Sequence, residues 1–170
     1  MKVKDFTNYL EQLAPLTLQE DYDNSGLIIG DFNMEVKGVL ITLDCNDKVL
    51  DEAINNKCNL LIAHHPIIFK GLKKINNDSL TDKLVIKAIK NNIAIYSIHT
   101  NLDNIINGVN SEIAKRLKLK NCRVLSSKNE CLRQLIFYCP KESTTDLIEK
   151  LCSVGAGAIG NYNNCSFKSS

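Results

Sequence analysis

The strongest structural pattern in this chain is the stretch GVLITLDCNDKVLDEAINNKCNLLIAHHP (residues 38–66). It opens with a short apolar run, 38–44, which follows a glycine and is typical of a buried strand. The next segment, 47–56, predicts a helix with Asn46 as its N-cap. A second apolar run, 59–66, predicts another buried strand. Two buried strands joined by a helix indicate a parallel pair.

The same alternation continues toward the C-terminus. A polar loop leads to an amphipathic segment that predicts a helix capped by Ser79 or Thr81. The run IAIYSIH (93–99) predicts a third buried strand, and a loop over 100–108 leads to a further helix. Residues 38–117 therefore predict an α/β fold, a three-layer domain with a parallel sheet and helices on both faces.

The N-terminal flank carries shorter patterns. Residues 5–14 place apolar side chains at helical spacing, and Pro15 ends the predicted helix. Residues 21–31, DYDNSGLIIGD, predict turns around a short apolar piece.

The segment after residue 125 has a different character. The run 132–139 predicts a strand, and a helix capped by Ser143 or Thr144 is expected after it. One strand and one helix cannot bury a core of their own. We therefore expect an α/β domain over 1–125 and, over 126–170, the start of a small α+β domain that ends before it is complete.

Composition indicates an ordinary globular protein, with 44% hydrophobic and 24% charged residues among 170. The net charge of +2 is too small to indicate nucleic acid or acidic lipid as a partner. The N-terminus has no secretory pattern, and no apolar run is long enough for a membrane span. The seven cysteines form no C-x-x-C pair, which favours reduced thiols. We expect a cytoplasmic protein without nucleic-acid or membrane partners.

The histidines and two aspartates gather at the ends of the predicted strands. His64 and His65 follow one strand, His99 follows the next, and Asp44 and Asp103 lie close to strand ends as well. In parallel sheets, ligands bind beyond the carboxyl ends of the strands. Imidazole and carboxylate are the usual ligands of zinc, iron and manganese. Neighbouring residues of a strand point to opposite faces, so the histidine pair could serve two adjacent metals.

These residues could also have purely structural roles. A histidine at a strand end is often a hydrogen-bonded rim residue, and Asp44 either orients a ligand histidine or caps the following helix. His64, His65 and Asp103 also cannot fill two metals that each need about four ligands. Water and His99 could add to them, and a complete site needs further protein ligands.

Four blocks of sequence resemble a known family. They are 21–30 (DYDNSGLIIG), 38–54, 59–75 and 93–117, and the last two combine HHP with HTNLD in the expected order and separation. On these residues the chain resembles the dinuclear-metal family of GTP cyclohydrolase I type 2 homologues, the NIF3-like proteins. The tail, 155–167, resembles the start of the small domain that longer members insert between their two halves.

The resemblance implies that His64, His65 and Asp103 are ligands of a site for two divalent ions, Zn, Fe or Mn, with His99 close by. It also implies a ring-like homohexamer and a metal-dependent hydrolase acting on a purine nucleotide, as in GTP ring opening. Longer members carry a second half that supplies a further histidine and a glutamate. No histidine follows His99 here, so we expect a truncated first half.

Three functional hypotheses stay open at this point. The first is a metal-dependent hydrolase, whose catalytic residues the sequence does not identify. The second is a non-catalytic metal-binding or scaffold protein that assembles with itself. The third is an inactive truncated fragment with an exposed sheet edge.

Overall fold

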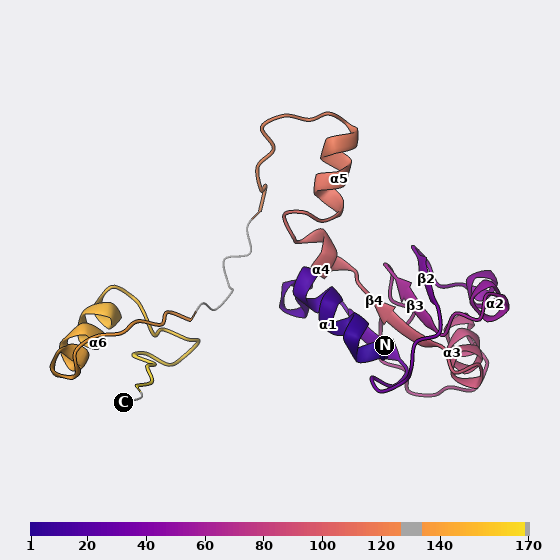
Figure 1. The fold of residues 1–170 in the computed structure, drawn as a ribbon, viewed down its shortest axis with the longest axis horizontal. Helices are drawn as coiled ribbons and strands as arrows, with labels where there is room; N and C mark the ends of the chain where they lie inside the picture. Colours follow the sequence, from indigo (N-terminus) through magenta and orange to yellow (C-terminus); the bar gives the residue numbers. More distant parts are fainter. Residues whose placement is uncertain (127–133, 169–170) are drawn as a thin grey trace. The chain divides into compact units, whose positions relative to one another are not determined.

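The computed structural model of the chain describes residues 1–126 and 134–168 (Figure 1). The chain consists of two compact units, Met1–Arg123 and Val124–Ser170. Among the described residues, no helix has both the length and the apolar character that a membrane crossing needs.

The first unit is built on a four-stranded sheet with the strand order β1-β4-β3-β2. The strands β2 (Val39–Thr42), β3 (Leu60–Ala63) and β4 (Ala94–Ser97) run parallel to one another, as the alternating sequence pattern predicts. The two central strands of the sheet, β3 and β4, are buried along their whole length. Because β3 and β4 run parallel, their carboxyl ends reach the same edge of the sheet.

The fourth strand, β1 (Gly26–Ile29), pairs with β4 in the antiparallel direction. We predicted only turns around a short apolar piece here, because three apolar residues between Gly26 and Gly30 give little periodic signal. Gly30 ends the strand with a φ of +122°, and a Cβ on it would lie 2.6 Å from the Cβ of Ala94. The close approach of β1 to β4 therefore requires glycine at this position.

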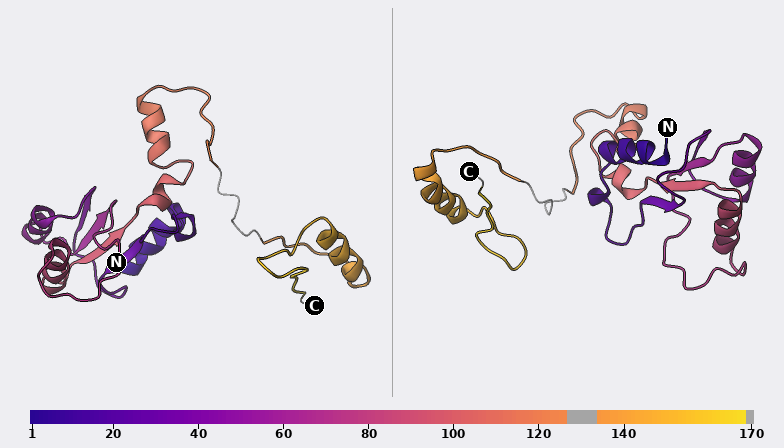
Figure 2. Two further views of the ribbon diagram at one scale, coloured as in Figure 1. Left: turned by 180° about the vertical axis from the view of Figure 1, so that it is seen from behind. Right: turned by 60° about the horizontal axis from the view of Figure 1, so that its bottom comes forward.

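The helices of the first unit cover both faces of the sheet, which confirms the three-layer α/β prediction (Figures 1 and 2). The helix α1 (Val3–Leu13) lies on one face, and α2 (Asp47–Asn55) and α3 (Leu80–Lys90) lie on the other. A short 3₁₀ turn, Leu16–Leu18, follows α1 in the chain and precedes β1. The helix α5 (Val109–Arg116) forms close to where it was predicted.

Two of the predicted helix caps are present. The side chain of Asn46 accepts a hydrogen bond from the backbone N–H of Val49 at 3.1 Å, which caps α2. Of the two candidates for α3, Ser79 is the cap: its hydroxyl accepts from the N–H of Asp82 at 3.0 Å. The carboxylate of Asp82 accepts in return from the N–H of Ser79, which completes a capping box.

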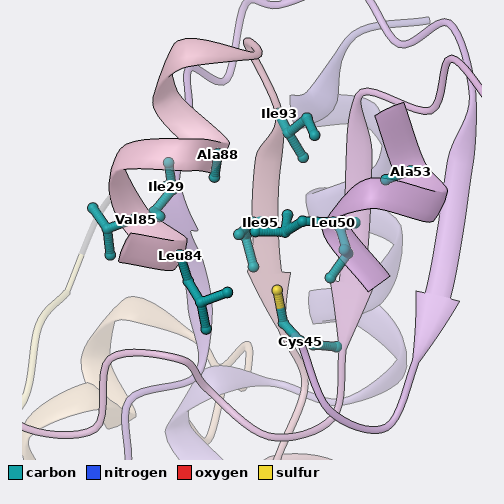
Figure 3. Close-up of a cluster of buried hydrophobic side chains, with 11 residues drawn as sticks. Ile29, Cys45, Leu50, Ala53, Leu84, Val85, Ala88, Ile93 and Ile95 are labelled. Carbon is teal, nitrogen blue, oxygen red and sulfur yellow. The ribbon is translucent and has the colours of Figure 1, made fainter. Parts of the chain in front are cut away.

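A buried cluster joins α2 and α3 to the sheet (Figure 3). Leu61 and Ile95 face this cluster from the two central strands. Their neighbours Leu60 and Tyr96 face the opposite side, where they pack with Val3 of α1. This alternation along each strand is what places one apolar layer on each face of the sheet.

The second unit contains a 3₁₀ turn (Lys141–Ser143), the helix α6 (Thr144–Ser153) and an isolated bridge between Ile159 and Tyr162. The strand predicted over 132–139 is wrong for residues 134–139, which have no regular structure, while 132–133 lie outside the described residues. A strand needs a hydrogen-bonding neighbour, and the described part of this unit offers none. No described residue from 124 to 168 is buried, so the described part of this unit contains no buried core.

The buried cluster predicts that substitutions of two leucines of α3 change the free energy of unfolding by very different amounts. Leu84 is buried between the helix and the sheet, whereas Leu80 is exposed at the first turn. We expect Leu84→Ala to lower the free energy of unfolding by about 2–5 kcal/mol, because it removes buried methyl groups and leaves a cavity. Leu80→Ala is the matched control and should change it by less than about 0.5 kcal/mol. Urea denaturation followed by circular dichroism measures both, and equal effects would contradict the packing described.

Candidate metal centre

Two adjacent histidines, His64 and His65, form a bend directly after the end of β3. The backbone N–H of His64 donates to the carbonyl of Thr42 at 3.1 Å, and that of His65 donates to Leu43 at 3.0 Å. Backbone hydrogen bonds between these two segments of the chain thus continue beyond the end of β3. The hydroxyl of Ser97 donates to the carbonyl of His64 at 2.9 Å and ties this segment to the end of β4.

The third histidine, His99, stands between β4 and a short helix, α4 (Thr100–Asp103). This helix occupies the start of the segment 100–108, which we predicted to be a loop. The side chain of the fully buried Asn101 accepts from the N–H of His99 at 2.9 Å and donates to the carbonyl of Ala14 at 2.7 Å. One helical turn later, the N–H of Asp103 donates to the carbonyl of His99.

These elements bring the three imidazole rings together. The ring centroids of His64 and His65 are 5.0 Å apart, those of His64 and His99 are 5.2 Å apart, and those of His65 and His99 are 5.5 Å apart. One ligand nitrogen from each ring lies within 4.8 Å of the other two. The carboxylate of Asp103 approaches the same group, with its Oδ1 at 3.9 Å from Nε2 of His64.

Each ring is held through its Nδ1 by an oxygen atom. Nδ1 of His64 lies 2.8 Å from the carbonyl oxygen of Ile98, which can only accept, so this nitrogen carries the proton. Nδ1 of His65 lies 2.7 Å from Asp44, and Nδ1 of His99 lies 2.8 Å from Asp23. A neutral imidazole that donates from Nδ1 keeps a lone pair on Nε2, which is the form that ligates metals.

The partner of His99, Asp23, has a fully buried side chain. Burial acts to raise its pKa, but hydrogen bonds from Thr100, His99 and the backbone N–H of Asn24 outweigh it and lower the pKa from 3.8 to about 2. The carboxylate accepts from the N–H of Thr100 at 3.0 Å and also from its hydroxyl. Asp23 is therefore ionised at neutral pH, so it can only accept a hydrogen bond, and Nδ1 of His99 is the donor.

The structure brings the predicted residues to one edge of the sheet. His64, His65 and Asp103 lie together there, His99 stands among them, and Asp44 binds His65. Sequence reasoning missed Asp23, which lies in the run 21–31 where we predicted only turns. The acidic residue beside a glycine-flanked apolar piece was the available signal, but its partner is 76 residues away in the chain.

The donor set fits a metal ion. Three imidazole nitrogens with free lone pairs and one carboxylate suit zinc, iron or manganese. His64 and His99 are largely buried, whereas His65 is about half exposed, so solvent reaches one side of the group. The histidine cluster can therefore hold a metal ion.

The fold and the cluster define an α/β protein with a candidate metal centre at the carboxyl edge of its sheet. The sequence model of the Duf34/NIF3 family (NGG1p interacting factor 3) matches residues 1–168. The chain belongs to this family.

Curated relatives carry the name GTP cyclohydrolase 1 type 2 homolog. The one from Clostridium acetobutylicum is 43% identical over 134 residues, which cover 79% of this chain and 50% of the relative. The one from Bacillus subtilis is 41% identical over 160 residues, which cover 94% of this chain and 43% of the relative. The chain thus spans about half the length of these relatives.

Solved structures of similar proteins agree with this assignment. A Bacillus cereus protein related to NIF3 matches with a TM-score of 0.71 and 37% identity, over 98% of this chain and 46% of that one. Reduced HcgD from Methanocaldococcus jannaschii matches with a TM-score of 0.66 and 33% identity, over 71% of this chain and 48% of that one.

The lowered pKa of Asp23 predicts a specific loss of stability in acid. Because the pKa in the folded protein is about 2 and the ordinary value is 3.8, the stabilisation is present above about pH 4 and is lost as the pH falls toward 2. The metal-free wild type should lose about 2 kcal/mol of unfolding free energy over this range relative to Asp23→Asn. Denaturant titrations at several pH values measure the difference, and parallel pH profiles would contradict it.

Proposed function

We propose that this chain binds a divalent metal ion through His64, His65 and Asp103 and that the loaded site serves hydrolysis of a purine nucleotide. The observation that carries the proposal is the convergence of imidazole rings whose Nδ1 atoms are all engaged, so that Nε2 is left for a ligand. Histidines that only stabilised the fold would not need to share one tautomer or to converge on one point.

The chain's own residues would prepare this site in advance. The carbonyl of Ile98 and the carboxylate of Asp44 hold the rings of His64 and His65, and Asp103 adds a negative charge beside them. Such partners raise the basicity of a ligand imidazole and fix its orientation. A bound divalent ion would supply Lewis acidity toward water or a substrate oxygen.

A two-ion centre is the finer form of this proposal. The adjacent His64 and His65 could each serve one ion, with Asp103 shared between them and His99 beside both. The described residues offer fewer side chains at this edge than two ions need, since each takes about four ligands. Water or a further polypeptide would have to complete the second ion.

We propose a purine nucleotide as the substrate because of the name of the relatives. Their name, GTP cyclohydrolase 1 type 2 homolog, supports a substrate of this class, although the chain spans about half their length. The homohexamer implied by the family resemblance and the cytoplasmic location stay predictions.

A second candidate is a metal-binding protein without turnover. The half-length match to the relatives and the small set of ligands among the described residues favour it. In that case the chain would keep the metal and the fold, and it would assemble without catalysis.

Metal content tests the site directly. We expect the purified 170-residue chain to retain about one or two equivalents of zinc, iron or manganese after gel filtration, since the imidazoles are already oriented. The double variant His64→Ala, His65→Ala should lose it, and Asp44→Ala should weaken binding roughly 10- to 100-fold by releasing one ring. Asp146→Ala, at an exposed position of α6, serves as the control. A wild type that holds no metal would overturn the proposal.

Turnover separates the two candidate functions. We expect the metal-loaded chain to convert GTP, and His65→Ala to abolish the conversion because it removes a ligand of the ion. Liquid chromatography of the nucleotide products measures this. Metal binding without conversion of GTP or another purine nucleotide would instead establish the non-catalytic candidate.

A further inference from the structure

Two exposed aromatic rings lie beside the histidine cluster. The centroids of Tyr22 and Phe69 are 6.1 Å apart with an interplanar angle of 39°, and Phe69 lies 6.3 Å from the ring of His99. Tyr22 is 64% exposed and Phe69 is 45% exposed. Adjacent aromatic rings that face solvent next to a candidate metal centre offer an apolar surface with nothing yet assigned to it.

The pair is fixed relative to the cluster although its members are far apart in sequence. The side chain of Asn24 donates to the carbonyl of Ile68 at 2.7 Å and so joins the two segments that carry the rings. Between Tyr22 and Asn24 stands the buried Asp23, which binds His99. The segment that carries Tyr22 therefore also carries the carboxylate that holds the third imidazole.

Positively charged residues follow Phe69 in the sequence. Phe69 is succeeded by Lys70, Lys73 and Lys74, which are all exposed, and residues 66–77 contain no acidic side chain. A ligand suited to this surface has a flat ring and a negative charge. Nucleotides combine both, because every base has a π-face that stacks on aromatic side chains and every phosphate attracts lysine.

We propose that Tyr22 and Phe69 form a stacking subsite for the base of a purine nucleotide, with the lysines of the segment 70–74 supplying positive charge for its phosphate. This inference rests on the proposed function, because it places the substrate of that site. A single aromatic pair accommodates one base rather than a strand, and the net charge of +2 gives little attraction for a polyanion. The ligand is therefore a free nucleotide.

The test compares GMP with ribose 5-phosphate on the full chain by NMR titration, since ribose 5-phosphate offers the same sugar phosphate without the base. Stacking predicts that the wild type binds GMP roughly tenfold or more tightly than ribose 5-phosphate. The double variant Tyr22→Leu, Phe69→Leu should lose this preference and keep its affinity for ribose 5-phosphate. Tyr9→Leu and Phe32→Leu are matched controls, because Tyr9 is 66% exposed and Phe32 is 50% exposed, and both should keep the preference.

Metal content measured on the same samples distinguishes the two proposals. If the double variant keeps the metal and loses the preference for GMP, the subsite is established separately from the metal centre. If the wild type holds no metal yet prefers GMP, the proposed hydrolytic function fails and the subsite stands. Equal affinities of the wild type for the two probes would overturn the subsite. So would a preference that survives the double variant, or tighter binding of a short guanine oligonucleotide than of GMP.

Discussion

The candidate site depends on the way each imidazole is held by its Nδ1. A free histidine side chain rotates and exchanges its proton between two nitrogens, so three nearby histidines alone would not form a ligand set. Here a backbone carbonyl, the carboxylate of Asp44 and the buried carboxylate of Asp23 each fix one ring. The lone pairs on Nε2 are thereby available before any ion arrives, which lowers the entropic cost of binding.

The three groups that hold the rings lie next to different strands, with Asp23 before β1, Asp44 after β2 and Ile98 directly after β4. The parallel strands β3 and β4 bring His64, His65 and His99 to one edge, as expected where ligands bind in α/β sheets. The segment before the antiparallel strand β1 adds two further side chains, Asp23 and Tyr22, at the same edge. The segment that leads into this four-residue edge strand thus holds one imidazole and carries one ring of the aromatic pair.

The sequence predicts those parts of this arrangement that depend on local patterns. The three parallel strands, the helices on both faces and the cap residues Asn46 and Ser79 follow from periodicity and capping chemistry. The gathering of the histidines follows from their position at the strand ends. The strand β1 and the role of Asp23 depend instead on contacts between residues more than 60 positions apart, which local patterns do not record. The strand predicted over 132–139 fails in its described part for a related reason, since apolar alternation forms a strand only beside a partner.

The most direct test of this arrangement is a long-range ¹⁵N–¹H NMR spectrum of the histidine side chains, recorded first on metal-free protein and then during titration with zinc. The chain has only three histidines, so every signal belongs to the cluster. We expect all three rings to show a protonated Nδ1 and a bare Nε2 without metal, and the Nε2 signals of His64 and His65 to shift when zinc is added. Rings that carry the proton on Nε2, or signals that zinc leaves unchanged, would contradict the convergent site.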